Sequence, residues 1–106
     1  MELQKIFEEL HGIRLCKSAY DFSKDYLGKS QSYYSVLKAN KAKPSIDTLA
    51  ILETALREKA SDYENDKYEI FTLRRKQLLS LSASVSTMRN QRCIDALSKY
   101  DSEVLK

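Results

Sequence analysis

The sequence has few residues that interrupt regular structure. Its 106 residues include two glycines and one proline, and none of these lies beyond Pro44. An all-β chain of this length needs many more turn residues, so this scarcity predicts an all-α fold. No apolar run approaches the roughly 20 residues that a membrane span needs. The first 15 residues carry three glutamates and no apolar core, so we expect no secretory signal peptide there.

Residues for metal binding and catalysis are also scarce. The two cysteines, Cys16 and Cys93, have no CxxC spacing, and His11 is the single histidine. This excludes a zinc site and favours free thiols in a reducing cytosol. The serine-rich stretch 79–86 lacks a glycine elbow and a nearby histidine, so a nucleophile is not expected there. We therefore expect no enzyme, no metal and no cofactor.

Four short helices are predicted in residues 1–60, because apolar residues recur there at helical spacing. Serines stand where helices begin, and glycine or asparagine stands where they end. The expected N-caps are Ser18, Ser30 and Ser45, and the expected ends are Gly12, Gly28 and a left-handed Asn40. Of the adjacent tyrosines, Tyr34 shares a helix face with Leu37, which predicts a buried Tyr34 and an outward-facing Tyr33.

Residues 61–106 form a second segment, predicted to be a long helix from about residue 67. A heptad-like apolar seam along it favours dimerisation through residues 67–105. The seam consists of Phe71, Leu78, Leu81, Val85 and Met88, and Leu97 belongs to the face that follows it. Because LSLSASVS at 79–86 also alternates with period two, a strand paired with a second chain stays open there.

Positive charge is concentrated in one short region. Residues 26–46 hold Lys29, Lys38, Lys41 and Lys43 and no acidic residue, whereas residues 47–69 have a net charge of −4. Between these lysines lie short neutral side chains that form hydrogen bonds without repelling phosphate. This composition is typical of a helix that lies in a groove lined by phosphates.

The stretch GKSQSYYSVLKANKAKPSIDTLAILETAL, residues 28–56, resembles the second half of the Cro/lambda-repressor-like (Xre-type) helix-turn-helix domain. The features that match are the glycine turn, the capping serine, two core positions of the recognition helix, the basic loop and the leucine-rich helix. They are Gly28, Ser30, Tyr34, Leu37, Asn40, Lys41 to Lys43, Pro44–Ser45, Leu49, Leu52 and Leu56. The resemblance covers roughly residues 3–60. Phe22–Ser23 looks like a one-residue insertion relative to the family's second helix.

This resemblance implies a compact DNA-binding domain of four to five short helices in residues 1–60. It says nothing about residues 61–106, for which the apolar seam predicts a helical dimerisation or partner-binding segment. The recognition helix, about 31–39, would enter the major groove. Its base-contacting residues would be Gln31, Ser32, Tyr33, Ser35 and Val36. Phosphates would be held by Lys17, Ser18, Lys29, Lys38, Lys41 and Lys43. The function implied is a sequence-specific transcriptional regulator, a repressor, that binds a palindromic operator of double-stranded DNA as a homodimer in the cytoplasm of a bacterium or from a phage.

Two alternatives use the same scaffold. One is a protein-binding adaptor or anti-activator whose C-terminal segment docks a partner, because a fold does not determine a function. The other is an antitoxin that represses its own promoter and neutralises a toxin through the C-terminal segment. Acidic residues on the third helix would favour the adaptor, and the sequence has none there.

Overall fold

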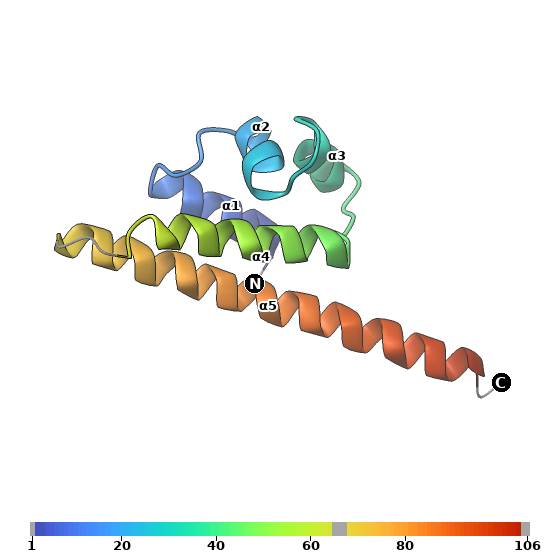
Figure 1. Ribbon diagram of the computed structural model, residues 1–106. Helices are drawn as coiled ribbons and strands as arrows, with labels where there is room; N and C mark the ends of the chain where they lie inside the picture. The colour runs from blue at the N-terminus through green and yellow to red at the C-terminus, as the bar shows by residue number, and fades with distance from the viewer. Residues whose placement is uncertain (1, 65–67, 105–106) are drawn as a thin grey trace.

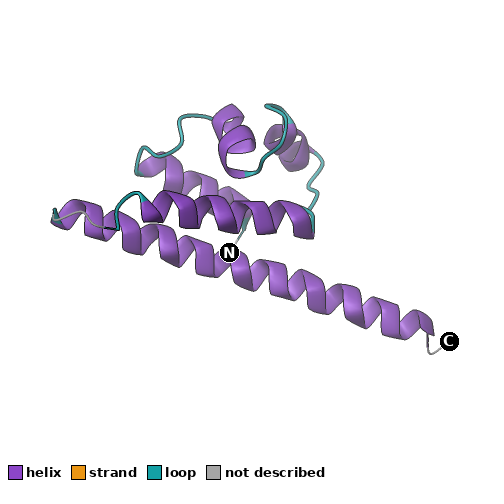
Figure 2. Ribbon diagram, in the orientation of Figure 1, coloured by secondary structure: helices purple, strands orange, loops and turns teal. Residues whose placement is uncertain are grey.

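The computed structural model describes residues 2–64 and 68–104, and every regular element in these ranges is helical (Figure 2). The prediction of an all-α fold is therefore confirmed. The elements are α1 (Leu3–Gly12), α2 (Ala19–Asp21), the π-helical η1 (Phe22–Tyr26), α3 (Tyr33–Ala39), α4 (Ile46–Ser61) and α5 (Glu69–Val104). Residues 79–86 lie inside α5, so the strand alternative for this stretch is wrong.

The helix starts follow the predicted caps at two of three places. The Ser18 hydroxyl accepts the backbone N–H of Asp21 at 3.3 Å, and that of Ser45 accepts the N–H of Thr48 at 3.2 Å. Ser30 does not cap α3. Its carbonyl accepts the N–H of Tyr33 at 3.1 Å in a turn, and α3 begins only at Tyr33.

The helix ends show two confirmed predictions and one correction, and α1 ends at Gly12 as expected. Gly28 has φ 62°, and a Cβ there would lie 3.2 Å from the side chain of Ile51. The left-handed backbone therefore favours glycine, and a side chain there would also require Ile51 to shift slightly. Asn40 is not left-handed, because it is the C-cap of α3 at φ −86°, and the next residue, Lys41, takes the left-handed conformation at φ 51°.

The expected insertion at Phe22–Ser23 coincides with the π-helical segment η1. The N–H of Leu27 donates to the carbonyl of Phe22 at 3.1 Å, five residues back rather than four. A π-turn contains one residue more than an α-turn, so it accommodates an added residue without breaking the helix. The second helix therefore continues from α2 into η1 and ends at the Gly28 turn.

The long helix α5 runs antiparallel to α4, beneath the shorter elements (Figure 1). At about 1.5 Å per residue, its 36 residues span about 54 Å, against about 24 Å for the 16 residues of α4. The C-terminal part of α5 consequently extends past the start of α4, and the molecule measures 58 × 27 × 18 Å. None of the helices in the described part of the chain is long and apolar enough to cross a membrane.

The seam predicted for dimerisation lies largely inside the single chain. Leu78, Leu81 and Val85 are buried in the same core as the leucines of α4. Residues with no exposed surface left cannot pack onto a second chain in this arrangement, so these three are corrected from dimer contacts to core residues. The physical reason is that α4 presents a complementary leucine stripe within reach of the connection between the two helices.

A buried carboxylate also joins α4 to α5. Glu53 contacts Arg57 one turn along α4 at 2.6 Å and Arg89 of α5 at 2.5 Å. The hydroxyl of Ser82 on α5 donates to the backbone carbonyl of Glu53 at 3.4 Å. This cluster sets the register of the two helices, because a buried charge strongly disfavours any register in which it has no partner.

Candidate nucleic-acid interface

The angle between the second helix and α3 is held by one buried hydroxyl. Ser23, in η1, donates to the carbonyl of Ala19 at 2.9 Å and accepts the N–H of Tyr34 at 3.0 Å. The second bond satisfies an amide in the first turn of α3, where no intrahelical partner exists. Ser23 therefore connects the body of one helix to the start of the next across the turn at Gly28.

Aromatic rings anchor the inner side of α3. The ring of Tyr34 packs edge-on against Phe22 at 5.0 Å between centroids and lies 5.3 Å from Phe7 of α1. Tyr34 is 4% exposed, which confirms its predicted place in the core. Burial, with the Glu8 carboxylate as a second cause, raises the pKa of Tyr34. Its phenol therefore stays neutral at physiological pH, as a buried anchor requires.

Tyr33 is held differently from the prediction of a simple outward-facing ring. Its hydroxyl lies 3.4 Å from that of Thr48, at the start of α4, and its ring packs partly against the core. Lys29 Nζ lies 5.7 Å from the ring centroid. Tyr33 thus fixes the start of α3 to α4 and leaves part of its ring surface accessible beside a cation.

The remaining predicted base-contacting residues lie on the outer side of α3 and of the turn before it. Gln31, Ser32 and Ser35 are exposed, and Val36 is 53% exposed. Gln31 and Ser32 border a shallow hollow together with Tyr20 and Lys24 of the second helix. The structure therefore places one amide, two hydroxyls and one apolar side chain on the outer surface of the helix pair.

Tyr20 and Lys24 were missed by the sequence analysis. Tyr20 is 60% exposed and lies next to the turn that carries Gln31. The helical spacing could have indicated the exposure of Tyr20. Phe22 and Tyr26 define the buried face of this helix, and Tyr20 does not lie on that face. Lys24 adds a cation to the same border.

The four lysines of the basic region lie before α3, on it and in the loop after it. All four are exposed, and none forms an ion pair with a residue in the described part of the chain. They are Lys29 before α3, Lys38 in its last turn, and Lys41 and Lys43 in the loop after it. Their charges are therefore available to an anionic partner.

The structure supports the predicted phosphate contact at Lys17–Ser18 less well than those at the four lysines of the basic region. Lys17 is exposed, but the Ser18 hydroxyl is engaged in capping Asp21. The carboxylate of Asp21 lies in the same first turn of α2, so the helix start already carries a negative charge. This disfavours an additional phosphate there.

Of the residues predicted for the dimer interface, three keep some exposed surface. Phe71 is half-buried and stacks on Tyr63 with 5.6 Å between ring centroids, and Met88 is half-buried against the core. Leu97 is 64% exposed near the C-terminal end of α5, with Ile94 exposed close by.

Among the described residues, no group of three or more histidine, cysteine, aspartate or glutamate side chains gathers where it could hold a metal ion.

Residues 3–98 match DUF6626, a family of unknown function. The chain belongs to this family. No curated protein and no solved structure matches it. The DUF6626 match includes α1 to α4 and most of α5, so the long helix is part of the family's sequence unit.

Proposed function

We propose that this DUF6626 protein is a sequence-specific double-stranded DNA-binding transcriptional regulator, a repressor, with α3 in the major groove. The second helix, the Gly28 turn and α3 would act as a helix-turn-helix pair of the Cro/lambda-repressor-like kind. The protein would work without a cofactor, in the cytoplasm.

One observation carries this proposal: α3 is anchored on its inner side and presents small neutral groups on its outer side, and exposed lysines lie before it, on it and after it that form no ion pair with a described residue. Gln31 can bond adenine bidentately, serine hydroxyls suit any base edge, and Val36 fits against a thymine methyl. The lysines supply the phosphate contacts that dominate affinity. A helix held by Ser23 and Tyr34 loses little freedom on binding, which favours the complex.

A homodimer would read two half-sites with its α3 helices about 34 Å apart. The contact surface would lie on the projecting end of α5. Because Glu53 pairs with Arg89, the start of α4 at Ile46, seven residues earlier, is level with about residue 96. Ile94 lies just before this point. Leu97 lies just beyond it, where α4 no longer covers α5.

The test of DNA binding is a fluorescence anisotropy titration of a labelled duplex from upstream of the protein's own gene. A scrambled duplex of equal length and a second salt concentration complete the measurement. The double variant Gln31→Ala/Ser32→Ala is expected to lose selectivity by about 1–3 kcal/mol for each lost bidentate contact. A matched control is Gln77→Ala/Ser80→Ala, which makes the same chemical change on α5 instead of at the start of α3.

If the unmodified protein binds both duplexes weakly and equally, its lysines attract DNA without sequence specificity, and the regulator proposal is wrong. No binding even at low salt would overturn it.

For the dimer, Ile94→Asp/Leu97→Asp is expected to convert two chains per duplex to one in sedimentation velocity. Leu73→Asp, an equally apolar exposed position at the opposite end of α5, serves as its control.

The second candidate is a protein-binding adaptor, and the exposed apolar residues of α5 favour it. Leu73, Leu79, Ile94 and Leu97 are each more than a third exposed. An adaptor would lose its partner through changes in α5 and keep it when Gln31 and Ser32 are replaced. The anisotropy measurement separates the two candidates, because an adaptor gives no selective DNA binding.

A further inference from the structure

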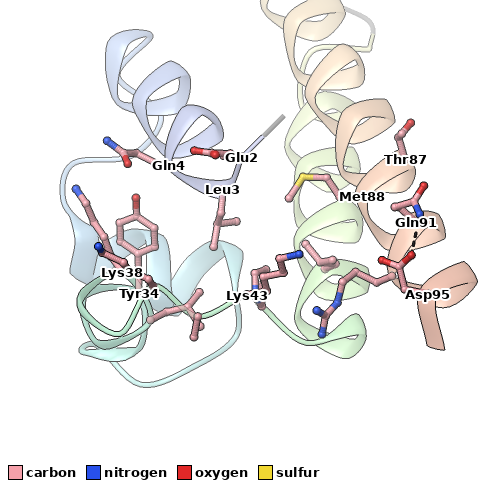
Figure 3. A pocket seen from close by; sticks show the side chains of 16 residues that line it. Glu2, Leu3, Gln4, Tyr34, Lys38, Lys43, Thr87, Met88, Gln91 and Asp95 are labelled. Atoms are coloured by element: carbon pink, nitrogen blue, oxygen red, sulfur yellow. Dashed lines mark hydrogen bonds between the residues drawn. The ribbon is translucent and has the colours of Figure 1, made fainter. Parts of the chain in front are cut away.

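A groove of about 700 Å³ separates the end of α3 and the basic loop from α5. Figure 3 shows Leu3, Tyr34 and Lys38 on one side of it and Met88 and Gln91 on the other. Its volume falls in the range of about 300–1,000 Å³ that small-molecule sites occupy. The groove joins the helix proposed to contact bases to the helix proposed to dimerise.

The floor of the groove is apolar. Leu37 and Met88 are half-buried and expose part of their side chains into it, and the buried Leu49 lies beneath. Such a floor offers nothing to a DNA phosphate, which is bound by cations and hydrogen-bond donors. It suits a hydrocarbon chain or an aromatic ring.

The rim is cationic. Four basic residues line it: Lys38, Lys41, Lys43 and Arg92. None of these four forms an ion pair with a described residue. Two acidic residues, Glu2 and Asp95, also line the groove, and Asp95 already accepts a hydrogen bond from Gln91 at 2.9 Å. The rim therefore keeps an excess of two positive charges next to an apolar floor.

We propose that this groove binds a small amphipathic anion, a carboxylate on an apolar body, and that its occupancy weakens DNA binding. The carboxylate would lie between Lys43 of the loop and Arg92 of α5, with the apolar body against Met88. The second part of the proposal rests on the proposed function. It follows because Lys38, Lys41 and Lys43 are also the cations assigned to phosphates, so a bound anion neutralises charge that DNA requires.

Linkage makes the effect reciprocal: if the anion lowers the affinity for DNA, DNA lowers the affinity for the anion by the same factor. Couplings of this kind are typically about 5–150-fold. The anion should also reduce the salt dependence of DNA binding, since fewer cations remain to replace counterions.

The experiment is a calorimetric titration of the full chain with decanoate, compared with decanol and decyltrimethylammonium. We expect one saturable decanoate site per chain and much weaker binding of the neutral and cationic analogues. The variant Lys43→Glu/Arg92→Glu should bind decanoate at least about tenfold more weakly, because two attractions become repulsions. The control Lys59→Glu/Lys76→Glu makes the same change of charge at exposed positions away from the groove and should bind as the unmodified protein does.

Equal binding of decanol and decanoate would overturn the groove as an anion site, as would no saturable binding or equal binding by both charge-reversed variants. The comparison of ligands uses the unmodified protein, so it decides the matter even if a variant unfolds.

The anisotropy titration is then repeated with saturating decanoate. Unchanged DNA affinity would overturn the regulatory part alone. Absence of DNA binding without ligand would overturn the proposed function, while the decanoate titration still decides the groove.

Discussion

Lys41 provides a test in which stability and DNA binding should change in opposite directions. Its φ of 51° places a lysine in the left-handed region, in a turn closed by the N–H of Ala42 donating to the carbonyl of Leu37 at 3.0 Å. A residue with a Cβ loses about 1–2 kcal/mol in this conformation. Glycine avoids that strain but is about 0.5–1 kcal/mol less favourable because of its freedom in the unfolded chain.

The net expectation for Lys41→Gly is a gain of about 0.5–1 kcal/mol in the free energy of unfolding. For a domain near 100 residues this raises Tm by about 2–8 °C. At the same time the variant lacks one cation of the basic loop. Its affinity should fall on every DNA sequence, and the slope of log K against log salt should decrease in magnitude by about 1.

Two further variants separate the two effects. Lys41→Gln removes the charge and keeps the strain, so it should weaken DNA binding as much as Lys41→Gly without raising Tm. Arg14→Gly relieves a similar left-handed residue, at φ 63°, in the loop after α1, and should raise Tm with little effect on DNA binding. The measurements are thermal unfolding by circular dichroism and anisotropy at several salt concentrations. Unchanged DNA affinity in both Lys41 variants would refute its role at a phosphate, and an unchanged Tm in Lys41→Gly would refute the strain.

Three other predictions concern the core. Ser23→Ala leaves the N–H of Tyr34 buried without a partner, so urea unfolding should show a loss of about 1–3 kcal/mol, and a loss below about 0.5 would contradict the bridge. Arg89→Met should reduce stability by about 2 kcal/mol, less than the 3–5 typical of a broken buried pair because the second arginine still contacts Glu53. Adding Glu53→Gln to that variant should restore part of the loss, and a purely additive double variant would argue against coupling. Burial raises the pKa of Cys16 from 9.0 to about 11, so the folded state holds this proton more tightly than the unfolded state. Its contribution to stability is complete below pH 9 and is lost as pH rises toward 11, and Cys16→Ala should flatten that decline in unfolding free energy.

Much of the local structure followed from the sequence, because short-range chemistry determines it. Ser18 and Ser45 cap helices since their hydroxyls reach amides three residues on, whatever the helix packs against. Glycine was expected at the left-handed turn at position 28 because a residue with a side chain is disfavoured in that conformation. Tyr34 was expected to be buried because it shares a helix face with Leu37. The candidate DNA surface was also largely predictable, since exposed lysines and short polar residues alternate with buried positions along one short helix.

The features that were not predicted depend on contacts between distant residues. The amide of Tyr34 in the first turn of α3 donates to Ser23, which lies in another helix and which no local pattern indicates. The hydroxyl of Tyr33 approaches Thr48, which no local pattern indicates. The groove beside Lys43 exists only because α5 passes within reach of the basic loop.

The long helix shows the division most clearly. Its sequence by itself predicted a helix from about residue 67 with one apolar stripe, because periodicity is a property of the segment, but it left a strand open at residues 79–86. It did not determine what covers that stripe, since a second chain and α4 offer similar leucine surfaces. The tertiary structure decided this. The connection brings α4 alongside at high effective concentration, and Glu53 pairs with Arg89 there. Leu78, Leu81 and Val85 are therefore buried within one chain, whereas Leu97 stays exposed.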